Sequence, residues 1–200
     1  MKYFRILLII LLVLGFASIA SAVTILDNSG ETYLYQIYDS LYPPGGHTAS
    51  SQLTQVTPSW TSGNWEILKT WKNAGNEQNL GYDYGGGFQH WIDNVPSTTG
   101  TTPTIQNSTK NLTASFNWVD RTGGNDWSSS GSNFVAFETT VPNQYLIAFE
   151  DLPLSVADKD YNDLVAVVEY IPTGVPEPTT MLLFGAGLLG VGLMRRRFKK

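Results

Sequence analysis

The residues best suited to chemistry lie in one acidic stretch, residues 150–163, directly before the apolar run Leu164–Tyr170. At an effective dielectric constant of ~20, two carboxylates ~5 Å apart repel each other by about 3 kcal/mol. Lys159 is the only basic residue in the stretch. A hard cation bound through oxygen ligands offsets such repulsion, and carboxylate and amide oxygens suit Ca²⁺. The sequence therefore predicts a Ca²⁺ site, with the ligand candidates Glu150, Asp151, Asp158, Asp160, Asn162 and Asp163.

Two other interpretations of this stretch are an EF-hand and a metal-free turn. Asp158, Asp160 and Asn162 fit EF-hand loop positions 1, 3 and 5, but position 6, normally glycine, is an aspartate. A strand over Leu164–Tyr170 would also carry Glu169, at position 12, ~20 Å away. These two departures exclude the EF-hand. The metal-free turn stays open, because Asp and Asn side chains also cap backbone N–H groups without any ion.

The composition gives little support to an enzyme. The chain has no cysteine, which excludes disulfides, thiolate metal sites and a thiol nucleophile. It has only two histidines, His47 and His90, which are too few for a histidine-rich metal site. Glu138 and Glu150 could form the acid pair of a glycosidase, but such a pair requires a defined carboxyl separation. The six tryptophans could include a sugar-stacking platform, although most tryptophans of a small β-domain pack in its core. We predict no catalytic residue and a protein that is not an enzyme.

Charge is distributed unevenly along the chain. The formal net charge is −5, but only five of the 12 basic residues (Lys69, Lys72, Lys110, Arg121 and Lys159) lie between the two ends, together with all 17 acidic residues. An acidic body of this kind disfavours nucleic acid and anionic lipid surfaces as partners. A cation or a neutral, hydroxyl-rich polymer remains compatible with it.

The body of the chain, residues 23–172, has the pattern of a β-rich domain. Short runs with a period near two occur at 33–38, 114–119, 133–138, 144–149 and 164–170, separated by Gly/Asn/Asp/Ser clusters. Ser50–Val56 and Glu66–Asn73 could each hold a short helical turn, and Thr98–Thr113 is the most loop-like segment. Many short strands with turn residues between them predict an all-β fold, a single jelly-roll-like β-sandwich domain.

Residues 1–22 have the features of a secretory signal peptide. Lys2 and Arg5 precede the apolar run Ile6–Phe16, and Ala20 and Ala22 flank Ser21 in a small-x-small cleavage site. The mature chain is therefore expected to begin at residue 23.

The C-terminal segment, residues 173–200, consists of three parts in a fixed order. Pro176-Glu177-Pro178 is followed by the glycine-bearing apolar stretch Thr179–Met194 and then by a basic cluster that includes Arg195, Arg196 and Arg197. A helix over 179–194 would be ~24 Å long, slightly less than the ~30 Å hydrocarbon core of a bilayer. Snorkelling arginines and local thinning absorb this mismatch. The stretch is therefore predicted to be a transmembrane helix with its basic end in the cytoplasm.

This three-part tail resembles the PEP-CTERM sorting signal of Gram-negative bacteria, on the residues just named together with Val175. The resemblance implies a membrane-embedded exosortase as partner, with cleavage near Pro176-Glu177-Pro178. It also implies an association with exopolysaccharide. The expected location is then the extracellular space or the cell envelope, with transient anchoring in the inner membrane.

A second resemblance covers residues 134–170. Phe149-Glu150-Asp151 at the end of an apolar strand, followed by Asp158-x-Asp160-Tyr161-Asn162-Asp163 before the next strand, is similar to the C-terminal motif of bacterial extracellular modules of the DUF4114 type. This resemblance implies a β-rich secreted domain in which cation binding is plausible.

Together these features predict a non-enzymatic, exosortase-sorted protein whose acidic, Ca²⁺-binding β-domain acts in adhesion or assembly of an extracellular matrix or biofilm. The alternatives from other classes are a polysaccharide-binding module and a polysaccharide-acting hydrolase.

Overall fold

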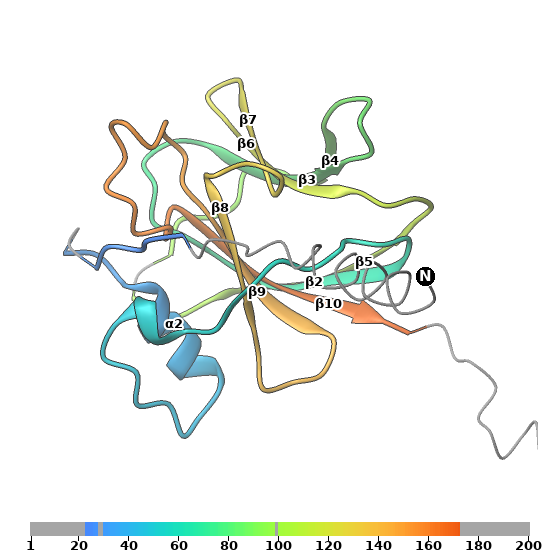
Figure 1. Ribbon diagram of the computed structural model, residues 1–200. Helices are drawn as coiled ribbons and strands as arrows, with labels where there is room; N and C mark the ends of the chain where they lie inside the picture. The colour runs from blue at the N-terminus through green and yellow to red at the C-terminus, as the bar shows by residue number, and fades with distance from the viewer. Residues whose placement is uncertain (1–22, 28–29, 99, 173–200) are drawn as a thin grey trace, which may run out of the picture.

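The computed structural model describes residues 23–27, 30–98 and 100–172, which form two antiparallel β-sheets stacked face to face (Figure 1). The larger sheet has the strand order β1-β8-β9-β10-β2-β5, and the smaller one has the order β4-β3-β6-β7. The strands are β1 (Gln55–Val56), β2 (Gly63–Lys72), β3 (Gln78–Asp83), β4 (Gln89–Ile92), β5 (Thr104–Leu112), β6 (Asn117–Thr122), β7 (Asn125–Ser128), β8 (Phe134–Glu138), β9 (Gln144–Phe149) and β10 (Leu164–Ile171). The predicted all-β sandwich is therefore confirmed.

The main core lies between the two sheets and is rich in aromatic side chains. Five of the six tryptophans are less than 10% exposed, and the sixth, Trp127, is partly buried against the same core. Trp60, Trp65 and Trp118 contact one another edge to face, with ring centroids 5.6 to 6.2 Å apart. This geometry suits the quadrupoles of aromatic rings. The tryptophans thus serve mainly as core, which leaves little for a stacking platform.

A helix covers the outer face of the larger sheet. Helix α2 (Leu34–Leu41) lies on the side away from the smaller sheet (Figure 1) and buries Leu34, Ile37 and Tyr38. These residues pack in a second core cluster with side chains of β8, β9 and β10. Because β10 is covered on both faces, Leu164, Ala166 and Val168 face the main core while Val165 and Val167 face the helix side. Because both faces of β10 are buried, its residues are apolar without alternation, which explains the continuous apolar run in the sequence.

Three local predictions were wrong. Of the predicted strand 33–38, residues 34–38 lie in helix α2, because the buried positions follow a spacing of three and four rather than two. Glu66–Asn73 lies almost wholly in β2, where a register shift between Ile67 and Lys69 makes the apolar spacing look helical. Thr98–Thr113 contains β5, an edge strand whose alternate residues are exposed and therefore polar.

The other predicted elements, one short helical turn and four strands, are present in the structure at or near the predicted residues. Residues 50–56 contain a short 3₁₀ turn, Ser50–Gln52, followed by β1. The runs predicted at 133–138, 144–149 and 164–170 correspond to β8, β9 and β10, and the run at 114–119 overlaps the start of β6.

The predicted signal peptide, residues 1–22, and the predicted transmembrane helix, residues 179–194, lie outside the described residues. Within the part of the chain that the structure describes, no helix has the length and apolar character needed to cross a bilayer.

Candidate cation site

The acidic stretch forms the connection between two neighbouring strands of the larger sheet. Strands β9 and β10 are antiparallel neighbours inside the sheet, and Phe149 is paired with Leu164, so residues 150–163 connect the two strands at the same end of the sheet. The loop closes on itself through a hydrogen bond from the Asp151 N–H to Asp163 Oδ2, 2.9 Å long. This closure brings together acidic residues that are up to 13 positions apart in sequence.

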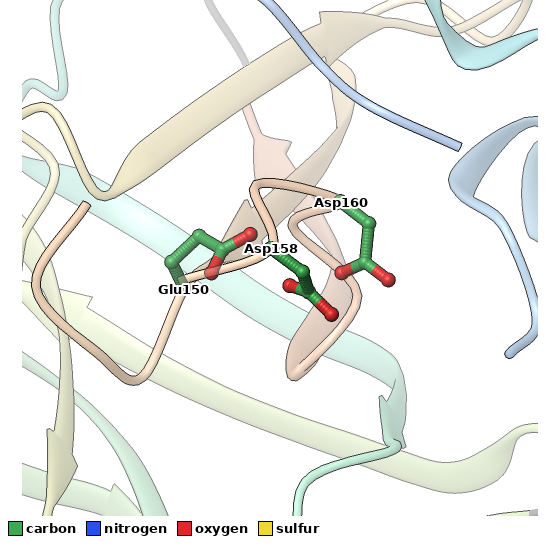
Figure 2. Close-up of side chains that lie close together, drawn as sticks. All are labelled: Glu150, Asp158 and Asp160. Carbon is green, nitrogen blue, oxygen red and sulfur yellow. The ribbon is translucent and has the colours of Figure 1, made fainter. Parts of the chain in front are cut away.

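Three of the six predicted ligands converge in this loop. Single carboxylate oxygens of Glu150, Asp158 and Asp160 all lie within 4.8 Å of one another, and Figure 2 shows the three side chains side by side. Glu150 and Asp160 are each 1% exposed, whereas Asp158 is exposed. We call these three residues the loop cluster. Its arrangement, two buried carboxylates and one at the surface, would give a cation a path from solvent.

The backbone of the loop is shaped around the Glu150 carboxylate. The Tyr161 N–H donates to Glu150 Oε1 at 2.7 Å, and the Tyr161 hydroxyl donates to the Ser132 carbonyl at 2.7 Å. Tyr161 and Lys159 have φ values of 55° and 66°, in the left-handed region that non-glycine residues seldom adopt. Such strain persists where surrounding contacts enforce it, and the buried Tyr161 ring supplies those contacts here.

Asn162 lies beside the loop cluster and combines two roles. Its N–H and its Nδ2 donate to the two oxygens of Asp160 at 3.2 and 2.7 Å, and Nδ2 also donates to the Thr32 carbonyl at 3.2 Å. These bonds are the turn chemistry expected of an Asx residue. Its Oδ1, however, is buried and has no hydrogen-bond partner among the described residues. A metal-free turn therefore accounts for the donors of Asn162 and leaves its acceptor unexplained.

The electrostatic environment disfavours charged carboxylates in the absence of a cation. Burial raises the pKa of Glu150 to about 7; the Tyr161 N–H opposes this, while the charges of Asp158, Asp160 and Asp151 raise the pKa further. Burial also raises the pKa of Asp163 to about 8. A bound divalent cation would reverse these shifts, because it favours the ionised form.

The two remaining predicted ligands, Asp151 and Asp163, are not part of the loop cluster. Asp163 Oδ2 accepts the Asp151 N–H. The Asp151 carboxylate accepts hydrogen bonds from Asn76 Nδ2 at 3.1 Å and Gln78 Nε2 at 3.2 Å. Asp151 therefore faces the smaller sheet, on the opposite side of the loop from Glu150.

Two buried polar residues on the smaller sheet, Gln78 and Asp120, were not predicted as site residues; both are 0% exposed. The sequence does contain one indication of this site. Asp120 is a charged residue directly after Trp118-Val119, where it interrupts an apolar strand pattern. The alternative of a glycosidase acid pair, Glu138 with Glu150, does not agree with the structure. Glu138 is paired with Tyr145, five residues from Glu150 along β9, which places the two backbones ~16 Å apart.

Comparison with known protein families supports the prediction for the C-terminal segment. Residues 174–197 match the PEP-CTERM protein-sorting motif. This motif implies an exosortase-type processing partner and a secreted, envelope-associated protein. The individual sorting residues, Ala20, Ala22, Pro176, Glu177, Pro178, Arg195, Arg196 and Arg197, lie outside the described residues. The comparison with curated proteins found no match.

Among solved structures, the similar chains include three bacterial lectins. The Chromobacterium violaceum lectin CV2L in complex with alpha-methyl-fucoside has 15% sequence identity and a TM-score of 0.37, and the match covers 60% of this chain and 96% of that chain. The Ralstonia solanacearum high-affinity mannose-binding lectin has 19% identity and a TM-score of 0.37, with 62% of this chain and 98% of that chain covered. The C-terminal domain of the BC2L-C lectin from Burkholderia cenocepacia has 18% identity and a TM-score of 0.32, with 61% of this chain and 97% of that chain covered. At these TM-scores the likeness carries no argument about what the present chain binds.

Proposed function

We propose that this protein is a non-enzymatic component of the cell envelope or extracellular matrix, sorted by an exosortase, whose β-sandwich binds Ca²⁺ at the loop cluster. The observation that carries the proposal is the convergence of Glu150, Asp158 and Asp160 within 4.8 Å, two of them buried. We also assign residues 134–170, which contain β8, β9 and β10, to a module of the DUF4114 type.

The charge balance of the loop cluster supports a divalent cation. Three carboxylates at this spacing repel one another, and the neighbouring charges that raise the pKa of Glu150 are all negative. Ca²⁺ accepts six to eight oxygen ligands in flexible geometry. Asn162 places a further buried oxygen without a partner next to Asp160, within the same loop. The cluster therefore provides the charge and ligand type that Ca²⁺ requires.

The strength of binding expected at such a site suits an extracellular module. With a Kd of ~10⁻⁴ to 10⁻³ M and about 1 mM Ca²⁺, the ion would stabilise the fold by ~0.4–1.4 kcal/mol. The loop that it would order also carries Leu152 and Val156, which are 44% and 70% exposed. In this proposal Ca²⁺ fixes the shape of a surface loop that contacts matrix components, exopolysaccharide among them.

The test of the cation site compares melting temperatures of the purified protein in 1 mM CaCl₂ and in EDTA. Wild type should melt a few degrees higher with Ca²⁺. Asp158→Asn should reduce this difference, because it removes one ligand charge from the loop cluster. Asp158 is exposed, so its replacement should not disturb folding. The matched control is Glu138→Gln, an exposed acid at the other end of the same sheet, which should keep the difference. If the melting temperature of wild type is the same in 10 mM CaCl₂ as in EDTA, the site is refuted.

The test of sorting is mass spectrometry of both termini of the protein isolated from its host. We expect an N-terminus at Val23 and a C-terminus near Pro176-Glu177-Pro178. An intact chain of 200 residues that stays in the inner-membrane fraction would contradict exosortase processing.

A further inference from the structure

A second polar group lies inside the sandwich, on the face of the smaller sheet that points to the main core. In the β3–β6 pair, Gln78 is opposite Thr122 and Leu80 is opposite Asp120. Because residues opposite each other and two apart share a face, Gln78 and Asp120 point the same way as Leu80, which is in the main core. Asp151 approaches this face from the β9–β10 loop and accepts the Gln78 amide hydrogen bond. We call Gln78, Asp120 and Asp151 the inter-sheet cluster.

Two acceptor oxygens of the inter-sheet cluster lack a donor. Asp120 Oδ2 accepts a hydrogen bond from the Thr122 hydroxyl at 2.8 Å, and the Asn79 N–H also acts on this carboxyl. Asp120 Oδ1 has no partner with hydrogen-bond geometry among the described residues. Gln78 Nε2 is used by Asp151, whereas Gln78 Oε1 also has no partner in the described part of the chain. Both side chains are 0% exposed, so bulk water does not reach them. Buried acceptors of this kind are rare in native proteins, since leaving one unsatisfied is costly.

The inter-sheet cluster also contains two carboxyl groups, those of Asp120 and Asp151. The next residue along β6, Arg121, does not compensate, because its guanidinium pairs with Asp126 at 2.7 Å on the other face of the strand. An internal water would satisfy the two acceptors but would leave the two carboxylates uncompensated. A divalent cation satisfies both requirements.

We propose that Asp120, Gln78 and Asp151 hold a second hard divalent cation, separate from the one at the loop cluster. The all-oxygen donor set of two carboxylates and one amide is that of Ca²⁺ sites. This cation would link the smaller sheet to the β9–β10 loop of the larger sheet and so fasten the two layers at one end. It is a structural ion between layers, in contrast to the ion near the surface of the loop.

The pleat of β9 explains how adjacent residues serve two sites. Phe149 faces the main core between the sheets, as the alternation along β9 requires. Continuing the alternation directs Glu150 toward the helix side and Asp151 toward the smaller sheet. Their partners agree, since Glu150 accepts from the loop residue Tyr161 and Asp151 accepts from Gln78. The two predicted ligands at 150 and 151 therefore belong to different cations.

The experiment counts Ca²⁺ ions per chain by equilibrium dialysis of the purified full-length protein against CaCl₂ after removal of metal with EDTA. Wild type should bind two ions. Asp120→Asn, which keeps the shape of the side chain, should bind one, and the ion it retains should be lost when Asp158→Asn is added. The matched control is Asp126→Asn, an acid of the neighbouring strand β7 that is paired with Arg121, and it should still bind two.

Gln78→Met provides a second variant, because it removes the unpartnered oxygen without changing any charge and should also bind one ion. If Asp120→Asn does not fold, as judged by near-ultraviolet circular dichroism, the count for Gln78→Met decides. If the folded variants still bind two Ca²⁺ ions per chain, the second site is overturned. The unpartnered acceptors would then be satisfied by an internal water or by a protonated Asp120 carboxyl. A single ion that disappears in Asp158→Asn supports the loop cluster alone and also overturns the second site. A single ion lost in Asp120→Asn but not in Asp158→Asn supports the second site and refutes the loop cluster.

Discussion

The two acidic groups of this protein lie on opposite sides of one loop but are built in different ways. The loop cluster takes its three carboxylates from eleven consecutive residues, 150–160, and opens to solvent at Asp158. The inter-sheet cluster combines side chains from β3, β6 and the β9–β10 loop, with Gln78 and Asp151 separated by 73 residues. The loop cluster can therefore form as soon as the loop closes, whereas the inter-sheet cluster requires that both sheets have already assembled. This difference predicts different energetic consequences for mutations in the two groups.

The largest effect is expected for Asp151→Ala in the presence of Ca²⁺. This change removes the acceptor of two side-chain amides and one proposed cation ligand, so the free energy of unfolding should fall by about 2–3 kcal/mol. Urea denaturation measures this value. Asp93→Ala, at a carboxylate whose side chain is 71% exposed, is the control and should change stability by less than ~0.5 kcal/mol. An equally small change for Asp151→Ala would remove the distinction between the two clusters.

A second effect concerns pH in the absence of Ca²⁺. Because the pKa of Glu150 is raised to about 7 in the folded protein, the folded state binds more protons than the unfolded state between about pH 4.5 and 7. The stabilisation that the folded protein gains from this extra proton on Glu150 is therefore present at low pH and is lost as the pH rises through 7. The pKa of Asp163, raised to about 8, acts in the same direction.

The melting temperature in EDTA should accordingly decline from pH 5 to pH 8. Glu150→Gln should make the decline shallower, because it removes one of the groups that lose a proton. In saturating Ca²⁺ the wild-type decline should also be shallower, since the cation keeps the loop carboxylates ionised. A stability that increases over this range in EDTA would show that these carboxylates are not held as the structure places them.

The smallest effect is expected for Asp160→Ala. The measured quantity is the gain in stability that Ca²⁺ gives, and this variant should reduce it. At about 1 mM Ca²⁺ this gain is ~0.4–1.4 kcal/mol, a shift of a few degrees in melting temperature. The variant should lose the part of the shift that is due to the loop cluster, and the Asp120→Asn variant should keep that part. If Asp160→Ala retained the full wild-type shift, the ion responsible would have to lie elsewhere in the chain.

The fold was predictable where local pattern and tertiary environment agree. The strands β8, β9 and β10 were recognisable because their apolar runs are bounded by turn residues and are buried as the pattern implies. Helix α2 was predicted as a strand because Tyr33, Tyr35 and Ile37 imitate a period of two, whereas the residues buried in the helix are Leu34, Ile37 and Tyr38. Strand β5 was missed because an edge strand needs few apolar residues, as its 57% exposed Ile105 illustrates.

The candidate sites divide in the same way. The three-part C-terminal signal, the β-rich character of the body and the crowding of acidic side chains in residues 150–163 can be recognised from the order of the residues, because each depends on close neighbours along the chain. That Glu150 and Asp151 have partners on opposite sides of the loop, and that Asp151 accepts a hydrogen bond from Gln78 of the smaller sheet, follows from the folded arrangement alone. Strand register and sheet stacking bring these groups together, and neither leaves a local trace in the sequence.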